Sequence, residues 1–143
     1  MMDRPDRQDR LPQIAILFSQ FAAYHVDRVE AAARRLAGRA EVLAVEYATT
    51  SAAYAWEPAE GIEQARHVTL FPGKSYDDVG HMARFRAAMK AVRHADMVCI
   101  GVPYSERDII ALSWRLAAAD CASATICASS ASSGRGSCRA TIR

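Results

Sequence analysis

The stretch QIAILFSQFAAYHVDRVEAAARR, residues 13–35, decides the fold of this chain. Its first part, residues 14–18, is an unbroken apolar run, which indicates a strand covered on both faces, because parallel sheets lie under helices on either side. In its second part, apolar residues recur at helical spacing opposite a charged face, which predicts an amphipathic helix. These apolar residues are Val26, Val29, Ala33 and Leu36.

The link between this strand and this helix, residues 19–25, is the first place to expect a ligand. Open α/β sheets bind ligands outside the carboxyl end of a strand, where the next helix starts. Ser19 and Gln20 offer a hydroxyl and an amide there, and the free N–H groups of the helix can meet a sugar or phosphate oxygen. His25, followed by Asp27, is the imidazole placed to act as a general base, with local capping or packing as the structural alternative.

The rest of the chain alternates strands and helices. Strands are expected at residues 41–47, 67–71 and 96–102, with Pro72 and Gly73 ending the middle one. Ser75 with Asp78, and Ser105 with Asp108, resemble helix caps. With right-handed crossovers, this order predicts an α/β fold, a Rossmann-like doubly wound parallel sheet in a single domain. The apolar positions of the two later helices are Met82, Phe85, Met89 and Val92, and then Ile109, Leu112, Trp114 and Leu116.

Two further regions carry candidate binding residues. The long loop at residues 48–64 contains Tyr54 and Trp56, which would suit a sugar face or a lipid surface, or would simply cover the edge of the core. Tyr104, Ser105 and Glu106 follow the strand at residues 96–102 and form a second candidate patch. At the first helix, Tyr24 joins the candidates, and Arg28 could meet an anionic acceptor or membrane phosphates, although surface charge is the default for an arginine.

Composition and charge narrow the function classes. The 143 residues suffice for one domain, and 51% are hydrophobic and 24% charged, as in ordinary globular proteins. The net charge of +2 is small and dispersed, so nucleic acid is not an expected partner. No apolar run approaches the ~20 residues of a membrane span. The charged start, residues 1–11, predicts a disordered leader and not a secretory signal, so we expect a cytoplasmic protein.

Motifs for cofactors and metals are missing from the sequence. Cys99, Cys121, Cys127 and Cys138 have no metal-type spacing. There is no G-x-G-x-x-G after the first strand and no P-loop. We therefore expect no cofactor and no metal site.

Three segments carry a resemblance: IAILFSQFAAYHVDRVEAAARRL, then EVLAVEYATTSAAYAWEP, then VTLFPGKSY. They resemble the amino-terminal, acceptor-side domain of bacterial GT-B glycosyltransferases, similar to the family 4 group. The resemblance covers residues 12–118. It implies a Rossmann-like domain that holds a glycan or small-molecule acceptor and faces a second domain that binds a nucleotide-sugar. The resemblance covers the first of these two domains, and we expect the second to be missing.

The resemblance stops where the composition changes. Residues 119–143 are rich in Ser, Ala and Cys, lack acidic residues from Cys121 on, and have no helix or strand period. This segment looks like coding DNA translated in a shifted frame, and a genuine flexible tail is the rival hypothesis. A truncated half-enzyme would be inactive alone and would expose apolar surface that favours self-association.

Two functions therefore stay open. The first is a truncated glycosyltransferase, the acceptor-binding half of an enzyme that uses a nucleotide-sugar donor. The second is a free-standing Rossmann-like or flavodoxin-like module that binds a small ligand or a partner. The sequence does not decide whether the chain is an enzyme, and peripheral membrane contact is a further expectation from Tyr54, Trp56 and Arg28.

Overall fold

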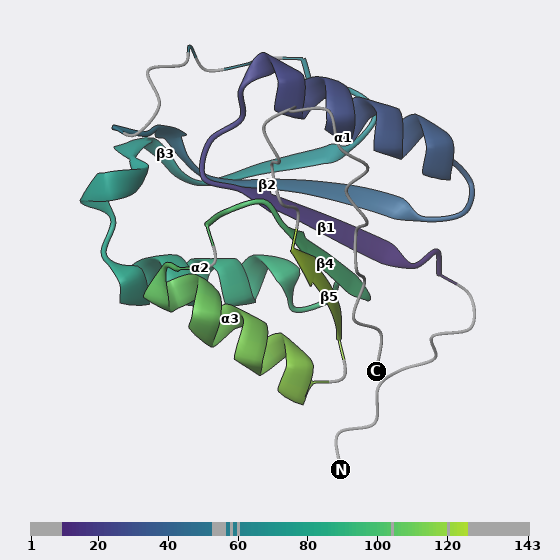
Figure 1. Cartoon of the computed structure of the whole chain (residues 1–143). Coiled ribbons are helices and arrows are strands. Elements are labelled where there is room, and N and C mark those ends of the chain that lie inside the picture. Colours follow the sequence, from purple (N-terminus) through teal and green to yellow (C-terminus); the bar gives the residue numbers. More distant parts are fainter. Residues whose placement is uncertain are drawn as a thin grey trace, which may run out of the picture.

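Five parallel strands form one sheet in the order β3-β2-β1-β4-β5 (Figure 1). The computed structural model describes residues 10–52, 57, 59, 61–103, 105–119 and 121–125. Residues 124 and 125 are described by their backbone alone. The strands are β1 (Gln13–Phe18), β2 (Glu41–Thr50), β3 (Arg66–Ser75), β4 (Met97–Ile100) and β5 (Ala122–Thr125). The helices are α1 (Ala23–Leu36), the short η1 (Tyr76–Asp78), α2 (His81–Val92) and α3 (Arg107–Ala118).

Helices cover both faces of this sheet, with α1 on one face and α2 and α3 on the other (Figure 1). Successive side chains of a strand point to opposite faces, so β1 contributes Leu17 to the α2–α3 side and Phe18 to the α1 side. In β2, Val45 likewise lies on the α2–α3 side and Ala44 on the α1 side. The predicted α/β, Rossmann-like parallel fold is confirmed, and burial on both faces explains the unbroken apolar run.

The strand order reverses at β1, which pairs with β2 on one side and with β4 on the other. Ligands of open α/β sheets bind at such a point, outside the carboxyl ends of the two strands. The strand ends approach closely here, because the backbone N–H of Gly101 donates to the carbonyl of Leu17 at 2.7 Å. A Cβ atom at Gly101 would lie 2.2 Å from the ring of Phe18. Only glycine fits this position without a shift of the ring.

The predicted end of the third strand at Pro72 and Gly73 is wrong, because β3 continues to Ser75. β3 lies at the edge of the sheet, where a proline without an N–H is tolerated. Its register with β2 shifts between Ala48 and Thr50. Gly73 takes a positive φ of 74° and donates its N–H to Oγ1 of Thr49 at 2.9 Å. The Pro-Gly pair therefore marks a bulge and not a strand end.

The predicted helix caps are also wrong. α2 begins at His81, after η1, and the Ser75 hydroxyl bonds the carboxylate of Asp77 instead of a helix N–H. α3 begins at Arg107 with Glu106 at its N-cap position, one residue after Ser105, and has no side-chain cap. Asp108 is buried and pairs with Arg84. Serine followed three residues later by aspartate is a weak signal when the carboxylate has a stronger cationic partner elsewhere.

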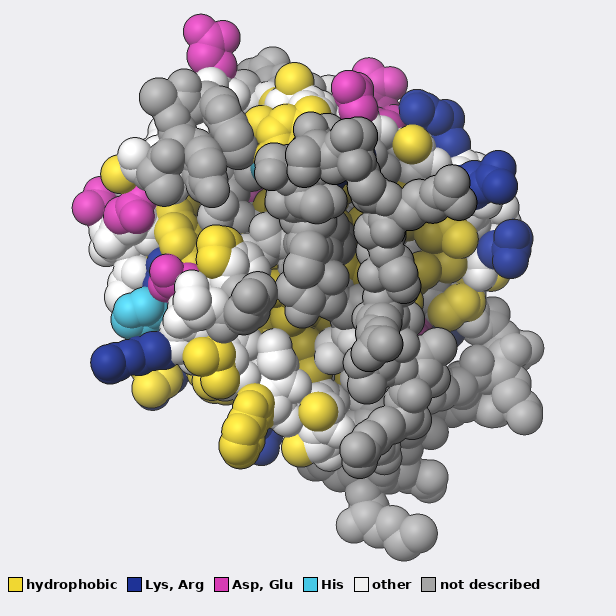
Figure 2. Space-filling model, viewed as in Figure 1, with side chains coloured by type: hydrophobic (Ala, Val, Ile, Leu, Met, Phe, Trp, Pro, Cys, Tyr) yellow, Lys and Arg dark blue, Asp and Glu magenta, His cyan; other side chains and the backbone are white. Residues whose placement is uncertain are grey.

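One predicted core position of α3 is wrong, while the others are confirmed. Ile109, Leu112 and Leu116 are buried, whereas Trp114 is 77% exposed. Ile109, Leu112 and Leu116 follow the spacing of three and four residues that keeps side chains on one face of a helix, and position 114 lies off that face. The space-filling view shows hydrophobic side chains at the surface over α3 (Figure 2).

A strand within residues 119–143 was not expected. β5 pairs with β4 in parallel, from Met97 opposite Ala122 to Ile100 opposite Thr125. α3 returns the chain to the open edge of β4, where backbone groups pair whatever the side chains are. Because the pairing is set by the backbone, the strand needs no apolar period. The expected leader before residue 10 and the tail after residue 125 lie outside the described residues.

Within the described ranges, no helix combines the length and the apolar character that crossing a membrane requires.

Candidate functional site

The β1–α1 link lies where the sequence analysis expected it, at the carboxyl end of β1. Ser19 is half-buried, and its carbonyl accepts the N–H of Ala48 at 3.1 Å. Gln20 is buried. The link is therefore held against β2, with the Gln20 side chain buried. The proposed contact of Ser19 and Gln20 with an acceptor stays a prediction.

His25 is buried at the start of α1. Its Nδ1 accepts the backbone N–H of Ala22 at 3.1 Å, and its ring packs on those of Phe18 and Tyr24, with centroids 4.0 and 3.9 Å away. Burial, and then the charge of Arg28, lower the pKa of His25 to about 4. The imidazole is thus neutral and weakly basic at neutral pH, as the capping alternative expects. Asp27 is exposed on the same helix.

A buried carboxylate organises the α1 side of this edge. We call Glu46, Phe21, His67 and Thr69 the Glu46 cluster. Oε2 of Glu46 accepts the backbone N–H of Phe21 at 3.0 Å, and Oε1 accepts the Thr69 hydroxyl at 2.6 Å. Nε2 of His67 lies 3.2 Å from Oε1. Glu46 thereby joins the β1–α1 link to β3, and both of its oxygens are used. The signal in the sequence was an acidic residue inside an apolar strand.

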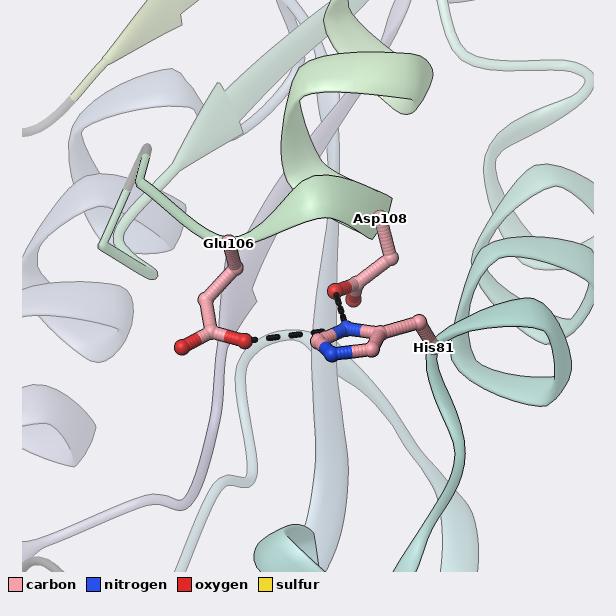
Figure 3. A group of neighbouring side chains, drawn as sticks. All are labelled: His81, Glu106 and Asp108. Atoms are coloured by element: carbon pink, nitrogen blue, oxygen red, sulfur yellow. Dashed lines mark hydrogen bonds and ion pairs between the residues drawn. The ribbon is translucent and has the colours of Figure 1, made fainter.

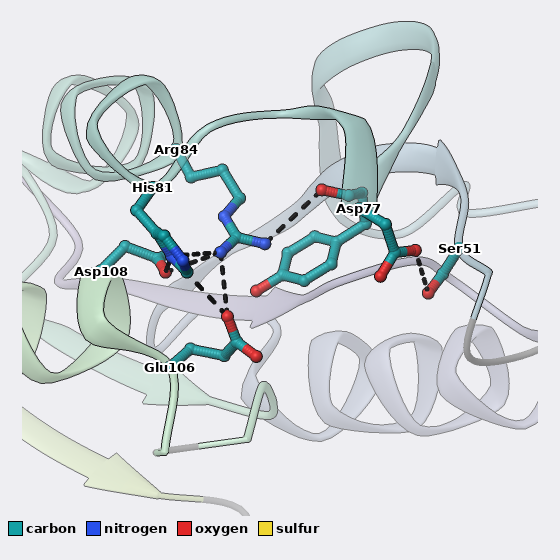
Figure 4. Close-up of polar contacts among 7 residues, drawn as sticks. Ser51, Asp77, His81, Arg84, Glu106 and Asp108 are labelled. Atoms are coloured by element: carbon teal, nitrogen blue, oxygen red, sulfur yellow. Dashed lines mark hydrogen bonds and ion pairs between the residues drawn. The ribbon is translucent and has the colours of Figure 1, made fainter.

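A second cluster lies on the α2–α3 side, where these two helices begin (Figure 4). We call His81, Arg84, Glu106 and Asp108 the Arg84 cluster. Nη2 of Arg84 donates to Oε2 of Glu106 and to Oδ1 of Asp108, both at 2.9 Å. Nδ1 of His81 lies 2.8 Å from Oδ1 of Asp108 and 2.6 Å from Nη2 of Arg84. One cation thus holds two carboxylates and an imidazole together.

Three of these residues also form a potential metal-ligand set, shown in Figure 3. The ligand atoms of His81, Glu106 and Asp108 lie within 4.8 Å of one another. However, Nη2 of Arg84 contacts all three ligand residues at 2.6 to 2.9 Å. The guanidinium therefore takes the position that a metal ion would need. Nη2 has two hydrogens and three close neighbours, so it cannot donate to all three. Nδ1 of His81 therefore either accepts one of these hydrogens, or carries a hydrogen of its own and donates it to Asp108.

Several polar atoms within this cluster and next to it are buried. Tyr47, Tyr76, Arg84 and Asp108 are each at most 7% exposed. Across the part of the chain that the structure describes, no hydrogen-bond partner reaches four of their atoms: Oη of Tyr47, Oη of Tyr76, Nε of Arg84 and Oδ2 of Asp108. Burial, and then the charge of Asp108, raise the pKa of both phenols, so both keep their protons. Cζ of Arg84 lies 4.1 Å from the centre of the Tyr76 ring.

The structure brings few of the predicted site residues together. Glu106 belongs to the Arg84 cluster, whereas Ser105 beside it is exposed. Tyr24 is partly exposed, and the guanidinium of Arg28 lies 5.5 Å from the centre of its ring. Tyr54, Trp56 and Tyr104 lie outside the described residues.

The sequence analysis missed His81 and Arg84, and named Asp108 only as part of a helix cap. A signal was present: Arg84 precedes the buried Ala88 and Val92 at intervals of four residues. Asp108 precedes Leu112 and Leu116 in the same way. A charged residue in line with the buried stripe of a helix indicates a buried ion pair.

Comparisons of the chain with family models, curated proteins and solved structures find no match.

Proposed function

We propose that this chain is the acceptor-binding half of an enzyme that transfers a sugar from a nucleotide-sugar donor. The observation that carries the proposal is the Arg84 cluster, which leaves buried donors and acceptors at the carboxyl edge of the sheet. Such edges hold the ligands of parallel α/β sheets, and a sugar-like acceptor offers hydroxyls that both donate and accept. The resemblance of residues 12–118 to glycosyltransferase domains supports the same assignment.

The nucleotide-sugar would bind a second domain, so we expect no transfer by this chain alone. The truncation and the shifted frame after about residue 117 belong to the same proposal. Reading the nucleotide sequence across codons 112 to 143 in three frames tests them. A frame that continues into glycosyltransferase sequence supports the truncation, and its absence favours a genuine tail.

Acceptor binding can be tested on the chain as it is. We would titrate ¹⁵N-labelled protein with glucose, mannose and UDP-glucose and follow the backbone amides by NMR. We expect shifts at residues 19–22, 101–102 and 105–108 with the sugars. Glu106→Gln should weaken the response, whereas Glu41→Gln, an exposed change at the opposite end of β2, should not. Absent shifts, or shifts concentrated away from the carboxyl edge, would contradict the proposal.

A free-standing ligand-binding module is the second candidate. β5 favours it, because the chain itself supplies a five-stranded sheet with helices on both faces. Such a unit needs no further strand from another domain. A ligand that co-purifies with the chain, such as a flavin seen by its yellow colour, would support this candidate over the first.

We also propose a cytoplasmic location and a tendency to self-associate. Cys99, inside β4, is a free thiol, which suits a reducing compartment. Met82 on α2 and Ile110 and Trp114 on α3 are large exposed apolar side chains, and exposed apolar surface promotes association. Light scattering after size exclusion tests the second point: a concentration-independent monomer would contradict it.

A further inference from the structure

We infer that Tyr47, Tyr76, Arg84 and Asp108 recognise a hydroxyl group of a neutral ligand, and that they do not bind an ion. This inference rests on the proposed function, because the hydroxyl would belong to the acceptor. It starts from the four buried polar atoms left over beside the Arg84 cluster. Buried polar groups in proteins almost always have partners, and these four atoms belong to neighbouring side chains. The ring centres of Tyr47 and Tyr76 lie 5.6 Å apart, Cζ of Arg84 lies 4.1 Å from the centre of the Tyr76 ring, and Arg84 bonds Asp108. This neighbourhood points to a ligand position.

The chemistry of the four atoms selects the ligand class. Nε of Arg84 can only donate a hydrogen bond, whereas Oδ2 of the Asp108 carboxylate can only accept one. A metal ion or an ammonium group cannot accept from Nε, and an anion without an O–H or N–H group cannot donate to Oδ2. A hydroxyl group does both. The phenols of Tyr47 and Tyr76 stay protonated and can adapt to either role.

The charge of the cluster excludes ions in both directions. Glu106 and Asp108 supply two negative charges against the single positive charge of Arg84, so an anion such as phosphate is repelled. A divalent cation would have to displace the Arg84 guanidinium from its contacts with His81, Glu106 and Asp108. That side chain is 4% exposed and stacks on Tyr76. A neutral ligand meets neither obstacle.

The exposed side chains of the cluster indicate the side from which a ligand would enter. The side chains of His81 and Glu106 are 54% and 34% exposed, whereas that of Asp108 is fully buried. A ring with several hydroxyls can place one against Asp108 and the phenols and others against His81 and Glu106. The cluster thus suits a polyol better than a simple alcohol.

The test uses myo-inositol as a neutral polyol, with inorganic phosphate and Zn²⁺ as ionic probes. Binding is followed by NMR titration of the whole chain. Tyr76→Phe and Tyr47→Phe remove one hydroxyl each, and a lost hydrogen bond of about 1 kcal/mol corresponds to a roughly fivefold weaker Kd. Tyr24→Phe makes the same change on α1 and should leave the inositol Kd within about twofold.

Three results would overturn the inference. Inositol could fail to bind, it could bind without a loss in the Tyr76→Phe and Tyr47→Phe variants, or phosphate or Zn²⁺ could shift the amides of His81 and Asp108 instead. The inference and the proposed function can fail separately. If glucose or mannose shifts the edge amides but both phenol variants bind normally, only the inference fails. If inositol binds with the expected phenol dependence and no sugar does, only the sugar-acceptor function fails.

Discussion

Two buried polar clusters lie at the same edge of the sheet, on opposite faces, and they differ in how completely their groups are paired. In the Glu46 cluster, both carboxylate oxygens receive donors from the β1–α1 link and from β3. Beside the Arg84 cluster, four buried atoms have no partner within the described ranges. The first arrangement is closed and acts as an architectural clamp, whereas the second can still receive a ligand.

Burial of a charged residue is therefore not by itself evidence of a binding site. A buried carboxylate needs compensation, and Glu46 obtains all of it from its own chain. Arg84 compensates Glu106 and Asp108 only in part, because each carboxylate has two oxygens and Nη2 reaches one on each side chain. What remains after internal pairing is the better guide to function.

Removing the cation of the Arg84 cluster should have the largest effect. Arg84→Met leaves the carboxylates of Glu106 and Asp108 without their cation, and breaking a buried ion pair costs about 3–5 kcal/mol. Urea unfolding followed by circular dichroism measures this loss. Arg86→Met on the exposed face of α2 is the matched control and should stay within about 0.5 kcal/mol. Equal losses in both variants would show that the cluster does not stabilise the fold.

Acid should destabilise the α1 side through His25. Its pKa is about 4 in the folded chain against 6.5 as the ordinary value, so the unfolded chain takes up the proton first as the pH falls. The contribution of neutral His25 to the free energy of unfolding is complete above pH 6.5. It declines by about 3 kcal/mol as the pH falls toward 4. Urea unfolding at a series of pH values measures the decline. His25→Gln keeps an acceptor for Ala22 and should flatten this part of the profile; an unchanged profile would rule out His25 as its cause.

Disturbing the closed cluster should cost less than removing Arg84. Glu46→Gln keeps one acceptor oxygen but turns an amide N–H₂ toward a donor, either the N–H of Phe21 or the hydroxyl of Thr69. Loss of one hydrogen bond to a charged group corresponds to about 1.5–3 kcal/mol. Chemical denaturation compares it with Glu41→Gln at the exposed start of β2. The sugar response at the Arg84 cluster should persist, and its loss would mean that the two clusters are one site.

The smallest expected effect comes from the point where β1 and β4 meet. Gly101→Ala brings a methyl group against Phe18, whose ring is held by contacts with Phe21 and His25. Overpacking of this kind costs about 1–3 kcal/mol. Thermal melting measures it, and the double variant with Phe18→Leu should recover part of the loss. No recovery would locate the strain in the backbone and not in the ring contact.

The sequence by itself determined the architecture. The apolar run at residues 14–18, the amphipathic helix after it and the alternation of strands and helices all depend on local periodicity, and the parallel Rossmann-like sheet follows from them. It also indicated the carboxyl edge as the place for a site, and Glu106 as one of its residues. These features could be predicted because burial on both faces imposes its pattern on neighbouring residues.

Only the tertiary structure decided which charged groups meet. Arg84 and Asp108 are 24 residues apart and come together through the packing of α2 on α3, and no local pattern encodes that distance. The same packing pairs Asp108 with Arg84 in place of its expected role in a helix cap. The strand β5 likewise depends on an open edge supplied by β4. The partner of a buried charged residue cannot be read from neighbouring residues, because an ion pair forms between side chains that the fold, and not the chain order, brings together.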